Sequence, residues 1–255
     1  MAAEGSPALI DLVRADRRWV DYVQVGPWLG PARMQVLAEA YPVLLHSNAG
    51  LVSRRLPFSA LSRWAKETGT PWLSLHLGLD DTQLNRLWKR FGLPLPRIGR
   101  HLGLTLAIEN LLAFQQMVEV PVAIENQAHH RPSGHDYVVD PAFICDVIAA
   151  TDSRLLLDLG HARVSAAMRG MPVTAYISKL PLAHVVELHV SGPGEYRGRL
   201  RDLHRPLSEA DYDLVSEVVA RCPQLRAITL EYFGPVATTR TQLQRLRTLL
   251  DTLTR

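Results

Sequence analysis

Short apolar runs that read as β-strands alternate along the chain with segments of helical periodicity. This order is typical of βα units, because parallel neighbouring strands need a crossover connection that is usually a helix. Seven runs are predicted strands: WVDYVQV (19–25), VLLH (43–46), WLSLH (72–76), VPVAIEN (120–126), LLLD (155–158), VVELH (185–189) and ITLEYF (228–233). Helices are predicted at 7–18, 31–40, 58–69, in two parts of 81–117, and at 141–151, 163–180, 208–221 and 238–254.

Chain length agrees with one closed barrel of such units. The chain has 255 residues, and a (β/α)8 TIM barrel takes about 250. We therefore predict a single TIM-barrel domain over residues 1–255. An eighth strand would have to precede the first helix, where only MAAEGSP remains. Either a very short first strand lies there, or the strand is missing and the barrel is open at that edge.

Six of the predicted strands end on a histidine, aspartate or glutamate. The carboxyl ends of the strands in a parallel barrel converge on one face, where catalytic sites are built. A lone histidine at a strand end is more often a packed or surface residue. The prediction of a site therefore depends on the fact that six strands end in this way. With three further residues close behind the strands, the candidate metal ligands are His46, His76, Glu125, Asp158, His161, His189, Asp202, His204 and Glu231.

The types and spacing of these residues favour a cluster of metal ions. Asp158 and His161 form a D-x-x-H motif, and Asp202 and His204 form D-x-H in a predicted Gly-rich loop over 191–206. Carboxylates can bridge two ions, and neutral imidazoles suit Zn, Fe or Mn. Carboxylates that converge in a dry cavity would take up protons unless cations compensated them. We predict two or three divalent ions, with Glu125, Glu231 and His161 as the candidate catalytic residues.

Charge and cysteine usage limit the possible partners. The formal net charge is +3 without a basic block, so nucleic acid is not an expected partner. The two cysteines have no C-x-x-C spacing, and neither a signal peptide nor an apolar run of 18 residues is evident. We expect a cytoplasmic protein without a membrane segment. In a polar loop after Glu125, substrate contact and plain exposure to solvent are equally open for His129, His130 and His135. Candidates for contact with DNA, which suit an acidic peptide or a phosphate equally, are Arg131, Tyr196, Arg197, Arg199 and Arg201.

The ligand order resembles the xylose-isomerase-like TIM barrels, and two branches of them in particular. All nine residue types occur in the chain order of the three-zinc site of endonuclease IV. The local sequence around these residues is more similar to the DUF692 family, the multinuclear non-heme iron-dependent oxidative enzymes of the methanobactin biosynthesis protein B type. The resemblance covers about residues 43–233 and is carried by IEN (124–126), LLLDLGHA (155–162), YISKLPLAHVVELHVSG (176–192), DLH (202–204) and TLEYF (229–233).

The second resemblance implies an iron-dependent oxidase that modifies cysteine in a ribosomal peptide, and a partner protein that presents the peptide is one option. Two features differ from the usual DUF692 pattern. The DUF692 pattern usually carries asparagine where this chain has Gly160-His161, and histidine at this position is the residue that endonuclease IV uses. The DUF692 pattern also often has glutamate where this chain has Gln24. The alternative is a divalent-metal-dependent hydrolase or isomerase that acts on a sugar phosphate or phosphate ester. A non-catalytic barrel is a third hypothesis, against which the complete ligand set argues.

Overall fold

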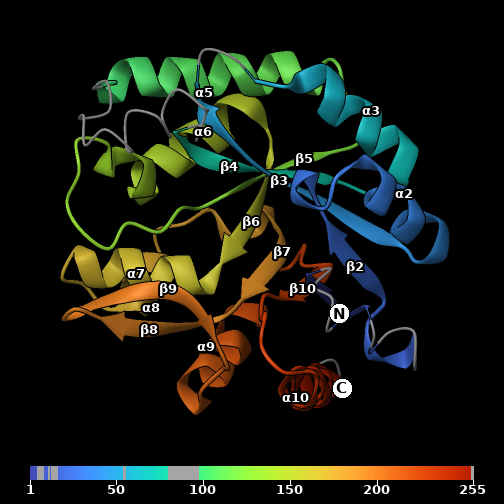
Figure 1. Ribbon diagram of the computed structural model, residues 1–255. Helices are drawn as coiled ribbons and strands as arrows, with labels where there is room; N and C mark the ends of the chain where they lie inside the picture. Colours follow the sequence, from blue (N-terminus) through green and yellow to red (C-terminus); the bar gives the residue numbers. More distant parts are fainter. Residues whose placement is uncertain (5–8, 11, 13–16, 54–55, 80–97, 254–255) are drawn as a thin grey trace.

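Eight parallel strands form a closed barrel in the order β1-β10-β7-β6-β5-β4-β3-β2 (Figure 1). The computed structural model describes residues 1–4, 9–10, 12, 17–53, 56–79 and 98–253. The barrel strands are β1 (Ala2–Glu4), β2 (Tyr22–Val25), β3 (Val43–Val52), β4 (Leu73–Leu79), β5 (Val122–Glu125), β6 (Arg154–Asp158), β7 (Val185–Val190) and β10 (Ala227–Leu230). The predicted TIM barrel is therefore confirmed.

The first strand is very short, as one of the two alternatives required. β1 has three residues and pairs in parallel with β10 on one side and with β2 on the other. Ala2 lies opposite both Thr229 and Tyr22. Ala2 and Ala3 are buried, and their small side chains fit where the two edges of the sheet meet. The barrel is closed at this edge.

Helices follow the strands and pack around the outside of the barrel (Figure 1). The α-helices are α2 (Pro31–Ala40), α3 (Phe58–Thr68), α5 (Arg100–Gln115), α6 (Pro141–Thr151), α7 (Leu159–Met168), α8 (Val173–Ile177), α9 (Glu209–Val219) and α10 (Val236–Leu253). Short 3-10 helices are η1 (Arg17–Trp19), η2 (Pro27–Leu29), η3 (Asp136–Val139) and η4 (Leu182–His184). Most of the helix predicted at 7–18, and the first of the two predicted within 81–117, lie outside the described residues.

Two of the helices begin where side-chain caps predict. The Asp140 carboxylate accepts a hydrogen bond from the amide of Ala142 at 3.1 Å, and Pro141 occupies the first helical position of α6. Ser208 and Asp211 form a capping box at the start of α9. Within the described residues, no helix is long and apolar enough to cross a membrane.

The single helix predicted over 163–180 is wrong. α7 already starts at Leu159, directly after β6, and ends at Met168, while α8 is a separate short helix. Gly170 takes a positive φ of 66° and Pro172 is the N-cap of α8, so the chain turns between them. Because α7 starts at the strand end, it holds His161 in its first turn, over the barrel.

The Gly-rich loop predicted over 191–206 is also wrong, because most of it is a β-hairpin. β8 (Gly192–Tyr196) and β9 (Arg199–Arg205) pair in antiparallel fashion and lie beside α7 (Figure 1). Arg197 and Gly198, the two residues between the strands, have φ angles of 52° and 69°. Positive φ at both central residues is typical of a type I′ turn, whose twist matches the paired strands.

An apolar floor closes the amino-terminal half of the barrel interior. It consists of Ala2, Leu44, Trp72, Ala123, Leu156, Val186 and Ala227, all of them buried. These residues come from six strands and from the position just before β4. A larger apolar layer fills the space between the barrel and the helices. The floor excludes water from one side of whatever lies above it.

Candidate metal centre

Strand alternation places the predicted ligands directly above the floor. Side chains two residues apart point to the same face of a strand. His46, Glu125 and Asp158 therefore share the inward face with the floor residues Leu44, Ala123 and Leu156 of the same three strands.

One group of potential ligands contains two histidines and a carboxylate. The Nε2 atoms of His46 and His76 lie 3.2 Å and 2.9 Å from Oε2 of Glu125, and 3.2 Å from each other. His46 and Glu125 are buried, whereas the side chain of His76 is 22% exposed. The three residues come from the neighbouring strands β3, β4 and β5.

His161 connects this group to the hairpin. Its Nδ1 lies 3.3 Å from Oε1 of Glu125, so the two oxygens of that carboxylate face different histidines. Its Nε2 lies 3.7 Å from Oδ2 of Asp158 and 3.3 Å from Oδ2 of Asp202. Gly160 permits this placement of α7 against the end of β7, because a Cβ there would lie 2.6 Å from Oγ of Ser191.

His189 and Glu231 complete the arrangement on the other side. Nδ1 of His189 lies 3.0 Å from Oε1 of Glu231 and 3.6 Å from Oε1 of Glu125. His204 lies between the hairpin and β10, with Nε2 3.1 Å from Oδ2 of Asp202 and Nδ1 3.7 Å from Oε2 of Glu231. The nine predicted ligands thus form one continuous network; their role as ligands stays a prediction.

Exposure is uneven across the network. The side chains of Asp158 and His189 are fully buried and that of Glu125 is 2% exposed. On the hairpin side, Asp202 and His204 are 18% and 27% exposed. The centre is therefore open toward the hairpin and at His76, and closed toward the floor.

Two details of the predicted placement need correction. β3 and β4 continue beyond His46 and His76 to Val52 and Leu79, so these histidines lie within strands and not at strand ends. The register between β3 and β4 shifts after Ser47, which allows β3 to continue as an irregular strand. Asp202 and His204 belong to β9, and His204 takes a positive φ of 45°, which turns its ring toward Glu231.

Polar side chains around the centre orient the predicted ligands. Oγ of Ser74 lies 2.8 Å from Nδ1 of His46. The side chain of Asn126 forms hydrogen bonds with both the main-chain amide and the main-chain carbonyl of Asp158. The main-chain carbonyl oxygen of Asn126 lies 2.8 Å from Nδ1 of His161. Second partners of this kind fix ring orientation and tautomer in metal sites.

The buried carboxylate of Glu187, below His189, was missed in the sequence. It accepts hydrogen bonds from the indole of Trp72 at 2.7 Å and from the hydroxyl of Thr229 at 2.6 Å, and it lies 3.4 Å from Nε2 of His189. Strand alternation could have identified Glu187 in the sequence, because Glu187 and His189 are two residues apart on one strand and share its inward face. Gln24, also buried, donates to Glu231 at 3.4 Å.

Burial dominates the electrostatics of the centre. It raises the pKa of Asp158 to about 7, a shift that His161 opposes and the carboxylates of Glu231 and Glu125 assist. Burial also lowers the pKa of His46 to about 4, which keeps this imidazole neutral. For His161, burial opposes the charged form, but Asp158 and Asp202 outweigh it and raise its pKa well above the ordinary value. In the absence of cations the centre therefore holds protons that bound metal would replace.

The donor atoms fit more than one metal ion. Several buried ones have no hydrogen-bond partner in the described part of the chain: Glu125 Oε2, Asp158 Oδ2, His204 Nδ1 and both ring nitrogens of His189. Unpaired buried polar atoms are costly, and coordination is one way to satisfy them. Three triplets bring their ligand atoms within 4.8 Å of one another, namely His46–His76–Glu125, Glu125–Asp158–His161 and Asp158–His189–Glu231. Because Glu125 and Asp158 each belong to two triplets, they are suited to bridge ions.

The remaining predicted residues lie outside this network. In the loop after β5, the ring of His129 pairs with Asp136 at 3.1 Å, and the buried His135 accepts a hydrogen bond from the amide of Ile98. These two histidines hold the loop in place. His130 and the four predicted arginines are at least partly exposed, namely Arg131, Arg197, Arg199 and Arg201.

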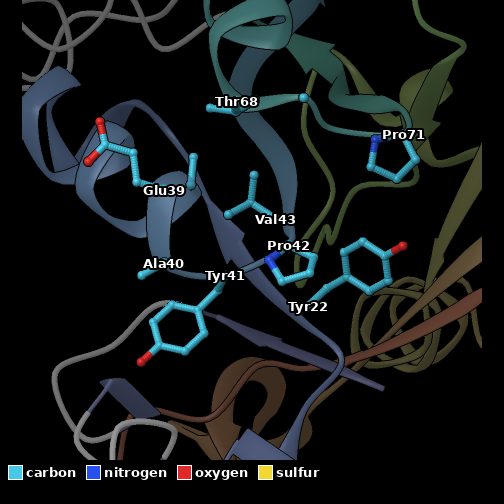
Figure 2. Close-up of a pocket in the computed structure, with 10 residues that line it drawn as sticks. Tyr22, Glu39, Ala40, Tyr41, Pro42, Val43, Thr68 and Pro71 are labelled. Carbon is cyan, nitrogen blue, oxygen red and sulfur yellow. The ribbon is translucent and has the colours of Figure 1, made fainter.

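A hollow of about 400 Å³ at the opposite end of the barrel is not part of the centre. Figure 2 shows its lining, including Tyr22, Val43 and Pro71, which lie at or before the amino-terminal ends of their strands. The floor separates these ends from the centre, and none of the nine predicted ligands lines the hollow.

The position of Asp202 and His204 predicts a separable subsite. The double variant Asp202→Ala/His204→Ala should lose one ion per chain and keep the others, because His46 and His76 lie on different strands. Metal content per folded chain, measured by mass spectrometry, checks this. Leu203→Ala/Arg205→Ala changes the same strand without touching the network and should keep all ions. Loss of all metal from a folded Asp202→Ala/His204→Ala protein would show that the subsites are not separable.

Solved structures similar to this chain share its fold. Endonuclease IV from Thermus thermophilus superposes with a TM-score of 0.62 at 16% identity, covering 98% of each chain. A xylose isomerase-like TIM barrel protein from Mycobacterium smegmatis, in complex with magnesium, superposes with a TM-score of 0.61 at 13% identity, covering 98% of this chain and 90% of that one. At these identities the likeness concerns the barrel alone.

Proteins of similar sequence indicate the family to which this chain belongs. A UPF0276 protein from Bordetella pertussis is 30% identical over 222 residues, 82% of this chain and 72% of the relative. A UPF0276 protein from Caulobacter vibrioides is 26% identical over 239 residues, 88% of this chain and 79% of the relative. The model of the family described as RiPP precursor modification enzyme MbnB/TglH/ChrH matches residues 20–251, which include all nine predicted ligands. The resemblance found in the sequence is thus confirmed, and the chain belongs to this family of enzymes that modify the precursors of ribosomally synthesised peptides.

Proposed function

We propose that this protein is an iron-dependent oxidase that modifies cysteine in a ribosomally synthesised precursor peptide. The observation that carries the proposal is the family match over residues 20–251, within which the nine potential ligands form one buried network. Family membership supports an enzyme that acts on a peptide. The metal, the residue that reacts and the type of reaction are our proposal.

The donor set supports iron. His46, His76 and Glu125 are two histidines and one carboxylate in one triplet, a combination that non-heme iron enzymes use with open positions for substrate and oxidant. None of the three triplets contains a thiolate, the donor typical of many structural zinc sites. When bound, iron would supply one-electron redox chemistry with dioxygen as the electron acceptor, and a position for the thiolate of the substrate cysteine.

The protein's own residues would bind the peptide, orient the metal ligands and shield the centre from water. The apolar floor keeps water out from below, and Ser74 and Asn126 hold His46, Asp158 and His161 in place. The peptide would approach from the open hairpin side. There the exposed ring of Phe233 packs edge-on against His204, with 5.0 Å between ring centroids, and offers an apolar wall. The oxidation would remove hydrogen from the carbon next to sulfur.

Oxygen uptake tests the proposal. Reduced, iron-loaded protein offered a panel of cysteine-containing peptides should consume dioxygen and change the peptide mass, whereas zinc-loaded protein should do neither. Glu231→Gln should abolish the uptake, because the amide keeps the shape but loses the charge that faces His189 and His204. Glu217→Gln, on the exposed surface of α9, is the matched control and should keep full uptake.

His161 favours a second candidate function, a zinc- or manganese-dependent hydrolase or isomerase acting on a phosphate ester or sugar phosphate. Its ring lies between Asp158 and Asp202, and such a donor set also suits zinc. The same experiment separates the two when abasic DNA and phosphosugars are added to the panel. Turnover of either by the zinc form, without iron-dependent oxygen uptake on any peptide, would establish the second function in place of the first.

A further inference from the structure

A group of arginines at the mouth of the barrel has no acidic partner among the residues that the structure describes. Elsewhere, Arg100, Arg163 and Arg245 each pair with an aspartate or glutamate. In the part of the chain that the structure describes, no such pair involves the following residues, which we call the basic patch: Arg131, Arg197, Arg199, Arg201 and Arg205. Arg131 belongs to the loop after β5, and the other four belong to the hairpin.

The hairpin register aligns these arginines. Tyr196 lies opposite Arg199 and Gly194 opposite Arg201, so these residues share one face of the hairpin, and Asp202 points to the other. The guanidinium groups of Arg197 and Arg201 each lie 5.2 Å from the centroid of the Tyr196 ring. The tyrosine therefore holds two cations at fixed positions, and the type I′ turn fixes the hairpin that carries them.

Lack of a side chain at Gly194 adds a further cation to this face. The side chain of Arg205 crosses the hairpin over Gly194, where a Cβ would lie 2.5 Å from its Nε. Nε of Arg201 is buried and has no hydrogen-bond partner among the described residues. The side chains of Arg197, Arg199 and Arg205 beside it are exposed and are thus available to an anion.

Within the described part of the chain, no carboxylate pairs with the patch, and the two carboxylates of the hairpin, Glu195 and Asp202, alternate to its other face. Burial and then the charges of Arg201, Arg131 and Arg199 lower the pKa of His130, in agreement with arginines of the hairpin and of the loop after β5 that lie near one another. Unpaired like charges held close together destabilise the free protein slightly and attract a ligand of opposite charge. The unpaired positive charge of the patch therefore favours binding of an acidic ligand.

We propose that the basic patch binds an acidic segment of the peptide substrate, which rests on the proposed function because it takes the substrate to be a peptide. The observations favour a peptide over nucleic acid. The formal net charge is only +3, and Tyr196 is the one tyrosine, phenylalanine or tryptophan of this hairpin, whereas single-stranded nucleic acid is held by several stacking platforms. The fork geometry of arginine suits the carboxylates of such a segment as well as it suits phosphate, so the low net charge and the single aromatic ring decide for a peptide.

The patch is close enough to the centre to place the reacting residue. Arg201 and Asp202 are consecutive in β9 but point to opposite faces of the hairpin, one toward the patch and the other toward His161. An extended peptide advances about 3.3 Å per residue, so a segment anchored on the patch can reach around the hairpin within a few residues. The acidic segment should therefore flank the residue that is modified and not contain it.

Binding of two labelled peptides to the metal-loaded protein tests the proposal. Both carry one cysteine, and its flanks hold four glutamates in one peptide and four glutamines in the other. By fluorescence anisotropy at low salt, the glutamate peptide should bind at least about tenfold more tightly, and added salt should remove the difference. Arg197→Glu/Arg199→Glu, two exposed positions outside the metal network, should weaken binding of the glutamate peptide by about tenfold or more.

Arg226→Glu is the matched control, because this arginine precedes β10 at the opposite end of the barrel. It should leave peptide affinity unchanged, and all variants should keep their metal content. Equal binding of the two peptides, or equal effects of the patch and control variants, would overturn the proposal. So would a single-stranded oligonucleotide that binds the patch more tightly than the glutamate peptide does.

This experiment separates the patch from the proposed function. Binding that depends on glutamate and on the patch, without oxygen uptake, would leave the inference standing and reject the oxidase. Oxygen uptake that is equal on both peptides, and unchanged by Arg197→Glu/Arg199→Glu, would support the oxidase and reject the patch.

Discussion

Glu125→Gln is expected to abolish the activity of the protein and to reduce its metal content to at most one ion per chain. Oε2 of Glu125 faces His46 and His76, and Oε1 faces His161 and His189. An amide offers only one oxygen and no charge, so it cannot serve both sides of the network. The residue lies in two of the three potential triplets, and its loss should therefore affect more than one ion.

Metal analysis after reconstitution, together with far-UV circular dichroism, checks this result. Glu119→Gln is the matched control, because it removes the same charge at an exposed position just before β5 and should leave metal content unchanged. A folded Glu125→Gln protein that still binds two or three ions would contradict the bridging position of this carboxylate. Glu125 would then be a neighbour of the metal site and not a ligand.

Removal of metal is expected to lower the melting temperature by roughly 10 °C. The unfolded chain cannot assemble ligands from different strands, so bound ions stabilise only the folded state. An ion at roughly a thousand times its dissociation constant contributes about 4 kcal/mol, and for a chain of this size each kcal/mol shifts the melting temperature by about 2–4 °C. Repulsion among the buried carboxylates of Asp158, Glu231 and Glu125 adds to the effect when cations are absent.

Calorimetry on protein before and after chelation measures the shift, and return of iron or zinc should restore it. The Asp202→Ala/His204→Ala variant serves as an internal comparison and should show a smaller shift than the unaltered protein. An unchanged melting temperature after verified removal of all metal would mean that the network is stable without ions.

The fold and the nine-residue network were predictable because both rest on periodicity. Apolar runs with βα spacing specify a parallel barrel, and a period of two places Glu125 and Asp158 on the inward face above Ala123 and Leu156. Even the short first strand was one of two alternatives. These features depend on local pattern, which a single sequence records.

What escaped prediction depends on backbone details that pattern does not record. The continuation of β3 past His46 relies on register shifts against β4, and only the paired strands reveal these. The hairpin was hidden because its turn is Arg197-Gly198, in which a non-glycine residue takes a positive φ. Glu187 could not be predicted from strand ends because it lies inside β7, although it is on the same inward face as His189.

The uneven exposure of the centre has a consequence for how metal enters and leaves. Among the described residues, the network is exposed at His76, Asp202 and His204, and the floor closes the other side, so ions should enter past these three side chains. The position next to the hairpin should therefore exchange quickly, while the ion near Asp158 and His189 is trapped behind it. Loading then proceeds from the inside outward and loss from the outside inward. A preparation that is short of metal should then consist mainly of molecules with a filled inner position and an empty outer one, and we expect its activity to fall sooner than its total metal content.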